Sequence, residues 1–463
     1  EIAKNKTGKK KIVVASILAA LAMAGSMQNV EATIPEGAAT GTATFAIGPQ
    51  SDANGAFGFS IGNNAKFNSG TLGFAIGVNS EATSNQSIAI GYLSKAAGRN
   101  IGGGGDPALA VGAGAKATAG GATAIGMVAN ASNTFATAIG KSAAASGDSS
   151  IAIGQNTKAT QEKAIAIGDT SQATNIGATA LGRSSEATGS SATALGSLAS
   201  ATGTTATAVG MQASASGSES LAIGNTASAT SGRALAVGTN AKATGASSVA
   251  VGSGAGNSGP LGFASSINSL GSVVNSLKTI NYATTAEGDY AVALGVYANA
   301  KNSGVAVGQN ALAATGGVAI GKGVLEDTGN NLAGGVAIGQ DSASTGAYSL
   351  AMGRHAFASG STSMAMGYEA SANGNFAVAM GRNVTATGTS TAIGRHAVAS
   401  NGGLAIGSQD NDAATDKTTA SAKGAVAIGK NTKATSEDAV AIGTNAEATS
   451  LKSVAPALPT ETC

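Results

Sequence analysis

Short apolar triplets that end in glycine recur along most of the chain. In the regular part the glycine returns every fourteen residues, and irregular copies flank that part on both sides, giving about 26 copies in all. A fixed period of this kind predicts a repeat array in which each unit contacts mainly its neighbours. The regular glycines are Gly112, Gly126, Gly140, Gly154, Gly168, Gly182, Gly196, Gly210, Gly224, Gly238 and Gly252.

One unit, residues 150–160, shows which elements the pattern predicts. Ile151 and Ile153 share one face of a short strand and Ala152 takes the other, so both faces are apolar and both are expected to be buried. We expect Gly154 to end the strand at a tight turn and residues 157–160 to form a second short strand. The interior would then hold a single layer of Ile or Val, and the alanine face would need cover from another chain.

A fourteen-residue repeat with two short strands in each unit predicts an elongated β-solenoid. Strands stack about 4.8 Å apart, so the repeats would build a rod of roughly 125 Å. Composition agrees, because the chain has 69 glycines, no tryptophan and only 3% aromatic residues, too few large side chains for an ordinary globular core.

Charge and cysteine content reduce the range of binding partners and of covalent cross-links to be expected. The net charge of +2 includes lysines of the N-terminal stretch, and without a basic patch interleaved with aromatic residues neither a nucleic-acid groove nor a polybasic membrane surface is indicated. Cys463 is the one cysteine, so no disulfide within the chain is expected.

The first 32 residues have the pattern of a secretory signal. A basic start is followed by an apolar run over 12–24 and by small residues at Val30 and Ala32, which predicts cleavage near Ala32 and export from the cytoplasm. The apolar run is too short to span a membrane comfortably.

The repeat resembles the head of YadA-like trimeric autotransporter adhesins, which use type Vc secretion. Residues 86–94, with the sequence QSIAIGYLS, match that family's unit closely, and the likeness extends over nearly all of 42–450. The resemblance implies a left-handed parallel β-roll of about fourteen-residue repeats, a homotrimer, and an adhesin of the bacterial cell surface linked to virulence. It further implies a host partner such as collagen, fibronectin, laminin or an immunoglobulin-fold cell receptor of the carcinoembryonic-antigen-related type.

The chain departs from that family after its last repeats. Family members continue into a coiled-coil stalk and an outer-membrane β-barrel anchor, and we expect both to be missing after the tail at 451–463. From the positions of the repeats we predict two stretches of head repeats, over 33–252 and 291–450, separated by an insertion over 253–290.

Binding specificity is expected mainly where the repeat is interrupted, because loops vary without disturbing the stack. The insertion carries Ile267 and Leu270 at helical spacing, which fits a short coiled coil, a helix packed on the roll, or a receptor-binding protrusion. Its flanking Tyr282 and Tyr290 make it the preferred contact region. The other candidate contacts are Tyr92 and Leu93 in a repeat turn, and Asp410 and Asp412 in a polar interruption.

No catalytic or cofactor-binding residues are predicted. The segments 316–323 and 424–431 nearly match a phosphate-binding loop but lack its Ser or Thr, and the repeat generates such near misses by itself. His355 and His396 are weak candidates for metal binding, through three copies that converge on a trimer axis. The alternative to a host-binding adhesin is a structural spacer or self-agglutinating surface protein without a specific receptor.

Overall fold

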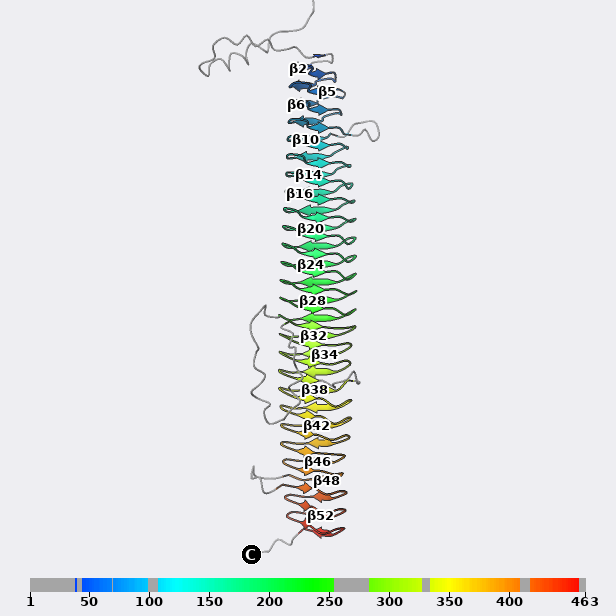
Figure 1. Ribbon diagram of the computed structural model, residues 1–463, viewed down its shortest axis with the longest axis vertical. Coiled ribbons are helices and arrows are strands. Elements are labelled where there is room, and N and C mark those ends of the chain that lie inside the picture. The colour runs from blue at the N-terminus through cyan, green and yellow to red at the C-terminus, as the bar shows by residue number, and fades with distance from the viewer. Residues whose placement is uncertain are drawn as a thin grey trace, which may run out of the picture.

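The chain winds into a straight rod of short parallel strands. The computed structural model describes residues 38–39, 44–68, 70–98, 107–253, 283–326, 334–408 and 417–457. Each coil, here called a rung, contributes a three-residue strand to one sheet and a two-residue strand to a second sheet that faces it. Figure 1 shows the rungs stacked in chain order, from β2 near one end to β52 near the other. The predicted parallel β-solenoid is therefore confirmed.

The two sheets alternate along the chain, and the odd-numbered strands alone form a 27-stranded sheet. The strands of the long-strand sheet are β2 (Phe45–Ile47), β4 (Phe59–Ile61), β6 (Phe74–Ile76), β8 (Ile88–Ile90), β10 (Leu109–Val111), β12 (Thr123–Ile125), β14 (Thr137–Ile139), β16 (Ile151–Ile153), β18 (Ile165–Ile167), β20 (Thr179–Leu181), β22 (Thr193–Leu195), β24 (Thr207–Val209), β26 (Leu221–Ile223), β28 (Leu235–Val237), β30 (Val249–Val251), β32 (Val292–Leu294), β34 (Val305–Val307), β36 (Val318–Ile320), β38 (Val336–Ile338), β40 (Leu350–Met352), β42 (Met364–Met366), β44 (Val378–Met380), β46 (Thr391–Ile393), β48 (Leu404–Ile406), β50 (Val426–Ile428), β52 (Val440–Ile442) and β54 (Val454–Pro456). The strands of the short-strand sheet are β1 (Ala38–Ala39), β3 (Asp52–Ala53), β5 (Lys66–Phe67), β7 (Glu81–Ala82), β9 (Lys95–Ala96), β11 (Lys116–Ala117), β13 (Asn130–Ala131), β15 (Ala144–Ala145), β17 (Lys158–Ala159), β19 (Gln172–Ala173), β21 (Glu186–Ala187), β23 (Ser200–Ala201), β25 (Ser214–Ala215), β27 (Ser228–Ala229), β29 (Lys242–Ala243), β31 (Thr285–Ala286), β33 (Asn299–Ala300), β35 (Leu312–Ala313), β37 (Leu325–Glu326), β39 (Ala343–Ser344), β41 (Phe357–Ala358), β43 (Ser371–Ala372), β45 (Thr385–Ala386), β47 (Val398–Ala399), β49 (Thr419–Ala420), β51 (Lys433–Ala434) and β53 (Glu447–Ala448).

The register repeats from rung to rung, so equivalent positions form columns along the rod. Ile151 pairs with Ile165, and Lys158 pairs with Gln172, each fourteen residues later. Pairing also joins Val249 to Val292, on the two sides of the largest interruption. The stack of rungs is therefore continuous across the segment 254–282, and the predicted helical seam with Ile267 and Leu270 lies outside the described residues.

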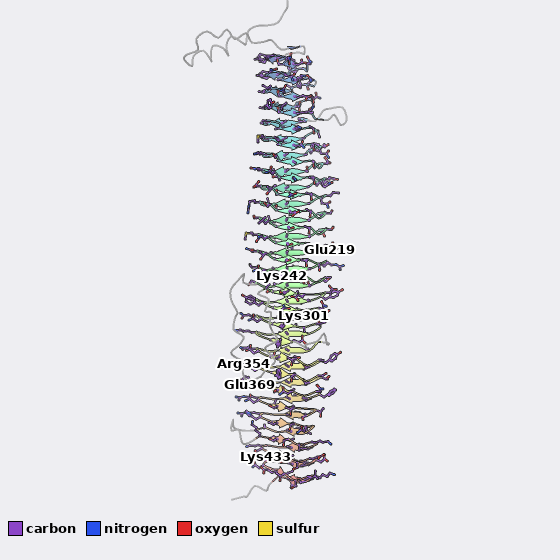
Figure 2. The ribbon with its side chains drawn as sticks, viewed as in Figure 1. Glu219, Lys242, Lys301, Arg354, Glu369 and Lys433 are labelled. Carbon is purple, nitrogen blue, oxygen red and sulfur yellow. The ribbon has the colours of Figure 1, made fainter. Side chains whose placement is uncertain are left out.

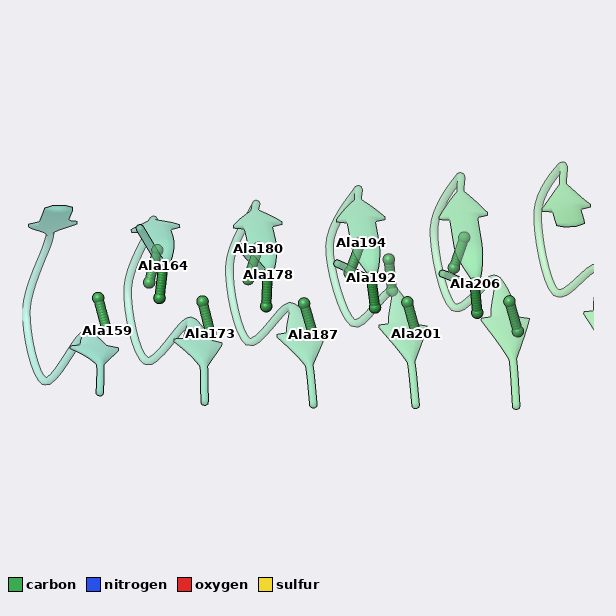
Figure 3. Packing of buried hydrophobic residues seen from close by; sticks show 14 of the residues in the cluster. Ala159, Ala164, Ala173, Ala178, Ala180, Ala187, Ala192, Ala194, Ala201 and Ala206 are labelled. Atoms are coloured by element: carbon green, nitrogen blue, oxygen red, sulfur yellow. The ribbon is translucent and has the colours of Figure 1, made fainter. Parts of the chain in front are cut away.

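Alanine fills the space between the two sheets. The middle residue of each long strand from β4 to β52 and the second residue of most short strands, such as Ala152 and Ala159, are fully buried. The residues before most strands, such as Ala164 and Thr157, are buried as well. Figure 3 shows alanines of both sheets pointing toward one another across a narrow gap. A coil of fourteen residues is so thin that mainly Ala, Ser and Thr fit inside it.

The prediction of which face is interior was wrong. Ile151 and Ile153 flank the fully buried Ala152 in the pattern intermediate, buried, intermediate, so they point outward and keep part of their surface exposed. The alanine column is the core rather than a face that awaits another chain. The apolar surface that stays exposed in the single chain is the outward face of the long strands, which carries residues such as Ile151 and Ile153.

The repeated glycine is required by both backbone conformation and stacking. Gly154 has φ of 134°, a value that L side chains rarely adopt, and a Cβ added there would lie 2.5 Å from the carbonyl oxygen of Gly168. The same oxygen accepts hydrogen bonds from Thr157 Oγ1 at 2.9 Å and Ser171 Oγ at 3.1 Å. These buried hydroxyls satisfy the carbonyl where the strand ends and the chain turns.

A large side chain enters the core at Phe67. Its ring is fully buried in a column that alanine otherwise dominates. Cβ atoms added to Gly55, Gly58 or Gly73 would collide with this ring, so three glycines provide the space that it fills.

A carboxylate enters the same column at Glu326. The side chain is fully buried, and its oxygens accept hydrogen bonds from the amides of Ala314 at 2.7 Å and Gly335 at 2.8 Å. A Cβ at Gly317 would collide with the carboxylate. The alanine core divides into two clusters one rung later, where the first ends at Ala337 and the second begins at Ala351.

Among the residues described above, none is assigned to a helix. Accordingly, no described helix has the length and hydrophobicity needed to cross a membrane.

Candidate functional site: exposed columns of the rod

The outer surfaces of the two sheets differ in polarity. In the long-strand sheet the outward positions, first and third in each strand, hold Ile, Val, Leu, Met, Phe or Thr in every described rung, apart from Pro456 in β54. In the short-strand sheet the outward position is mostly polar or charged, and ion pairs join Lys95 to Glu81 at 2.9 Å and Lys433 to Glu447 at 2.8 Å. We call the first surface the outer apolar face; one side of the rod is thus suited to protein contact and the other to water.

A second apolar surface lies at the turn that follows the repeated glycine. Three of four consecutive rungs place Val78, Tyr92, Leu93, Met127 and Val128 there, while the rung after Gly112 has Ala113 and Gly114. All five side chains are exposed, with Tyr92 at 57% and Val128 at 56%. We call these five residues the Tyr92 patch. It includes Tyr92 and Leu93, which the sequence suggested as contacts.

Backbone hydrogen bonds hold the rungs of the Tyr92 patch in register. The amide of Leu93 donates to the carbonyl of Val78 at 3.0 Å, that of Gly114 to Tyr92 at 2.7 Å, and that of Val128 to Ala113 at 2.8 Å. The exposed side chains therefore project from a rigid ladder rather than from a flexible loop.

Two members of the patch break a local preference of the fold. Leu93 has φ of 55° and Val128 has φ of 59°, at a turn position where Asn156 and Asn79 occur in other rungs. The left-handed region favours Asn over bulky or β-branched side chains. Leu198 and Thr226 adopt the same conformation at this position in other rungs, so it belongs to the repeat as a whole.

Sequence reasoning missed Val78, Met127 and Val128. No motif marks them, and they become a patch only because the fourteen-residue register brings equivalent turn positions into one column. A search for apolar residues at the two positions after each repeated glycine would have found them.

Tyr290 is the one aromatic of the preferred contact region that the structure describes. It is 68% exposed and lies in the other turn of its rung, where its amide donates to the carbonyl of Ala246 at 2.8 Å. Tyr282, Asp410 and Asp412 lie outside the described residues.

The two histidines follow the repeated glycine in rungs that are not adjacent. The ring of His355 meets that of Tyr368 edge-on at 6.2 Å between centroids, and the amide of His396 donates to the carbonyl of Arg382 at 2.9 Å. In the part of the chain that the structure describes, no group of three or more His, Cys, Asp or Glu side chains could hold a metal ion. Convergence of three copies on a common axis stays a prediction.

The segments that nearly match phosphate-binding loops form ordinary rungs. β36 and β50 occupy their centres, so the chain there is strand rather than a loop around an anion. The pKa values that shift clearly belong to an exposed pair in which Lys163 hydrogen-bonds Glu162 at 2.8 Å, which lowers the pKa of the carboxyl and raises the pKa of the amine. This pair fits a surface ion pair rather than acid–base chemistry.

Comparison with known proteins agrees with this architecture. The family model of the YadA head domain repeat matches most of the chain, over residues 39–65, 69–94, 104–129, 131–157, 145–171, 159–185, 173–199, 187–213, 201–227, 215–239, 229–255, 282–298, 333–356, 358–383 and 418–455. No curated protein matches the chain. The YadA head family is adhesive rather than enzymatic in kind. The chain therefore belongs to the YadA head repeat family, whose members are adhesin-type proteins exposed on the bacterial surface.

Proposed function

We propose that this chain is the head of a homotrimeric adhesin that binds a host protein through the Tyr92 patch. The observation that carries the proposal is the exposure of five apolar side chains on three rungs within a run of four, Tyr92 among them. Tyrosine is enriched where interfaces derive most of their binding energy, and a rigid ladder loses little conformational entropy on binding. Three copies per trimer and many trimers per cell would make weak single contacts sufficient.

The outer apolar face supports the homotrimer. Its uncharged positions extend over the described rungs from β2 to β52, a far longer apolar surface than the Tyr92 patch. A monomeric soluble protein rarely exposes such a surface, and association of three chains around it would bury it. The polar short-strand sheet would then face solvent.

Binding to immobilised collagen, fibronectin, laminin and an immunoglobulin-fold receptor of the carcinoembryonic-antigen-related type tests the proposal. We expect Tyr92→Ser with Val128→Asn to weaken binding to the cognate protein by tenfold or more, about 1.4 kcal/mol, because both changes remove apolar contact area. Asn suits the left-handed conformation of Val128, so the fold is retained.

The matched control changes the same turn positions in a rung outside the patch, as Gln155→Ser with Asn156→Ser. These residues are exposed and polar, and their change should leave binding intact. Equal binding by the patch variant and the control would contradict a role for the Tyr92 patch. Failure of the unchanged chain to bind any of the four proteins would favour the alternative, a spacer or self-agglutinating surface protein.

A further inference from the structure

Two exposed aromatic side chains lie on the turn that joins a short strand to the next long strand. Tyr348 is 66% exposed and Phe376 is 64% exposed. Figure 2 shows Glu219, which has the same turn position in an earlier rung, at one edge of the rod and Arg354, which follows a repeated glycine, at the opposite edge. We call Tyr348 and Phe376 the aromatic pair; it lies on the edge opposite the turn that carries the Tyr92 patch.

Backbone hydrogen bonds fix the spacing of the aromatic pair. The amide of Thr362, in the rung between the two rings, donates to the carbonyl of Ala347 at 2.7 Å. The amide of Phe376 donates to the carbonyl of Ser361 at 2.9 Å. Two rung spacings therefore separate Tyr348 from Phe376, about 10 Å in all. The φ values of Tyr348, Thr362 and Phe376 are 55°, 57° and 59°, so the three side chains leave the backbone in the same direction.

Both rings of the pair are available to a ligand. Among the described residues, neither ring stacks on another aromatic ring or on a guanidinium. The turns that carry them belong to the continuous ladder of rungs, so they are held in place before any ligand arrives. A rigid surface of this kind loses little conformational entropy on binding.

The turns around the pair carry no charge. Residues 345–348, 359–362 and 373–376 contain only Gly, Ala, Ser, Thr and Asn besides the two rings. The segment 327–333, in the rung before them, lies outside the described residues and includes one acid, Asp327, and no base. A charged ligand would therefore find no partner of opposite charge in the three described turns, whereas a neutral ligand needs none.

Polar groups beside the rings can hydrogen-bond a neutral ligand. Thr362 is exposed between the two rings, and its hydroxyl can both donate and accept. The amide of Ser361 donates to Oδ1 of Asn375 at 3.0 Å, which orients the exposed Asn375 side chain by its oxygen rather than by its NH₂ group. The edge thus alternates aromatic rings with hydroxyl and amide groups.

We propose that the aromatic pair binds a linear neutral glycan of β-linked sugars with equatorial substituents. The faces of such a sugar ring carry C–H bonds that pack on aromatic faces, while its hydroxyl groups hydrogen-bond to polar side chains at the rim. Along an extended chain the same sugar face recurs with each disaccharide, a length close to the separation of Tyr348 and Phe376. A protein ligand fits less well, because a binding hot spot needs a continuous apolar centre and the exposed Thr362 separates the rings.

Saturation-transfer NMR titration of the full chain with N-acetylchitohexaose, a straight neutral β-linked chain, tests the proposal. We expect Tyr348→Ser with Phe376→Ser to weaken binding about tenfold or more, because both stacking contacts are lost. Ser149 and Ser191 hold the same turn position with φ of 54° and 53°, so the fold is retained. Absence of binding by the unchanged chain would overturn the proposal.

The spacing of the rings is tested by a matched variant that keeps the composition of the edge. Thr362→Phe with Phe376→Thr moves the second ring to the rung next to Tyr348, about 4.8 Å away. Phe135 shows that the position accepts phenylalanine, at φ of 54°. We expect binding to weaken severalfold, because the second ring no longer faces the equivalent sugar. Binding as tight as that of the unchanged chain would overturn the proposal, since any pair of exposed rings would then suffice.

Further controls address the ligand class and the site. Maltohexaose, whose α linkages curve the chain, and heparin, which is anionic, should bind far more weakly than N-acetylchitohexaose. Equal binding of either one would overturn the assigned ligand class.

Tyr92→Ser with Val128→Asn should leave glycan binding unchanged, because the Tyr92 patch lies on the opposite edge. A loss equal to that of the serine variant of the pair would overturn the assigned site. Light scattering on each variant must give the mass of the unchanged protein. A changed mass would show that the aromatic pair joins copies of the chain and would overturn the proposal.

Discussion

Gly154 illustrates why one residue type recurs in every rung. Its Cα lies so close to the next rung that a single methyl group would meet the carbonyl of Gly168 at 2.5 Å, and its φ of 134° disfavours any L side chain. Gly177 lies in the left-handed region too, at φ of 63°, but a Cβ there would meet nothing nearer than Ser191 Oγ at 3.4 Å. The two requirements for glycine, a backbone conformation that disfavours side chains and close contact with the next rung, can therefore be tested separately by substitution.

We predict that Gly154→Ala destabilises the rod far more than Gly177→Ala. The second change carries only the cost of a left-handed alanine, about 1 kcal/mol, whereas the first also forces two rungs apart and should exceed about 3 kcal/mol. Thermal unfolding followed by circular dichroism measures both. Equal losses of stability would show that conformation alone, and not contact between rungs, requires the glycine.

At the scale of the rung, the sequence predicted the strands but not their orientation. The fourteen-residue period, the glycine turn and the second short strand near Thr157 follow directly from the spacing of residues. Alternation alone does not reveal which face of a two-sided apolar strand is interior. The width of the coil decides it, since Ala152 fits between sheets that would leave no room for Ile151 or Ile153.

The exceptional core residues were also missed, for a related reason. Phe67 and Glu326 occupy alanine positions, and each is accommodated by glycines on other strands or turns of the coil. Gly73 faces the phenyl ring and Gly317 faces the carboxylate. The sequence evidence for both residues was a large side chain at an alanine position together with extra glycines in the neighbouring rungs. A search within a single repeat does not detect this combination, because the residues lie in different repeats.

We predict that Glu326→Ala weakens the rod locally. The change leaves the amide of Gly335 without this acceptor inside the coil, at about 1–3 kcal/mol, whereas the amide of Ala314 keeps its bond to the backbone carbonyl of Glu326 at 3.0 Å. Hydrogen exchange followed by mass spectrometry should show faster exchange in peptides that contain the Gly335 amide. Glu447→Ala, which removes an exposed ion-pair partner, is the control and should change exchange little. Unchanged exchange in the Glu326 variant would contradict a stabilising role for the buried carboxylate.

At the scale of the whole molecule, the outer apolar face determines how chains associate. Association of chains is still expected, but not through the alanines, which are buried inside each coil. The expected interface is formed by residues such as Ile153 and Ile167, whose side chains are partly exposed in the single chain. Charged residues at these positions would be buried without partners in an assembly.

We predict that light scattering on the unchanged chain gives three times the mass of one chain. Lysine at Ile125, Ile139, Ile153 and Ile167 should reduce the mass to that of a single chain, because each buried, unpaired charge costs several kcal/mol. Lysine at Ser200, Ser214 and Ser228, on the polar sheet, should leave the assembly intact. A single-chain mass for the unchanged protein would refute the homotrimer.

The constant register has a consequence for how such a rod changes in evolution. Because Ile151 pairs with Ile165 and Lys158 with Gln172, excision of one whole period rejoins equivalent positions and leaves every column aligned. The distance between the Tyr92 patch and a distant residue of the same turn, such as His355, can therefore shorten or lengthen in steps of about 4.8 Å while both stay on one edge. Gene duplication and deletion in units of one rung would thus change how far the Tyr92 patch lies from other parts of the rod without changing its chemistry.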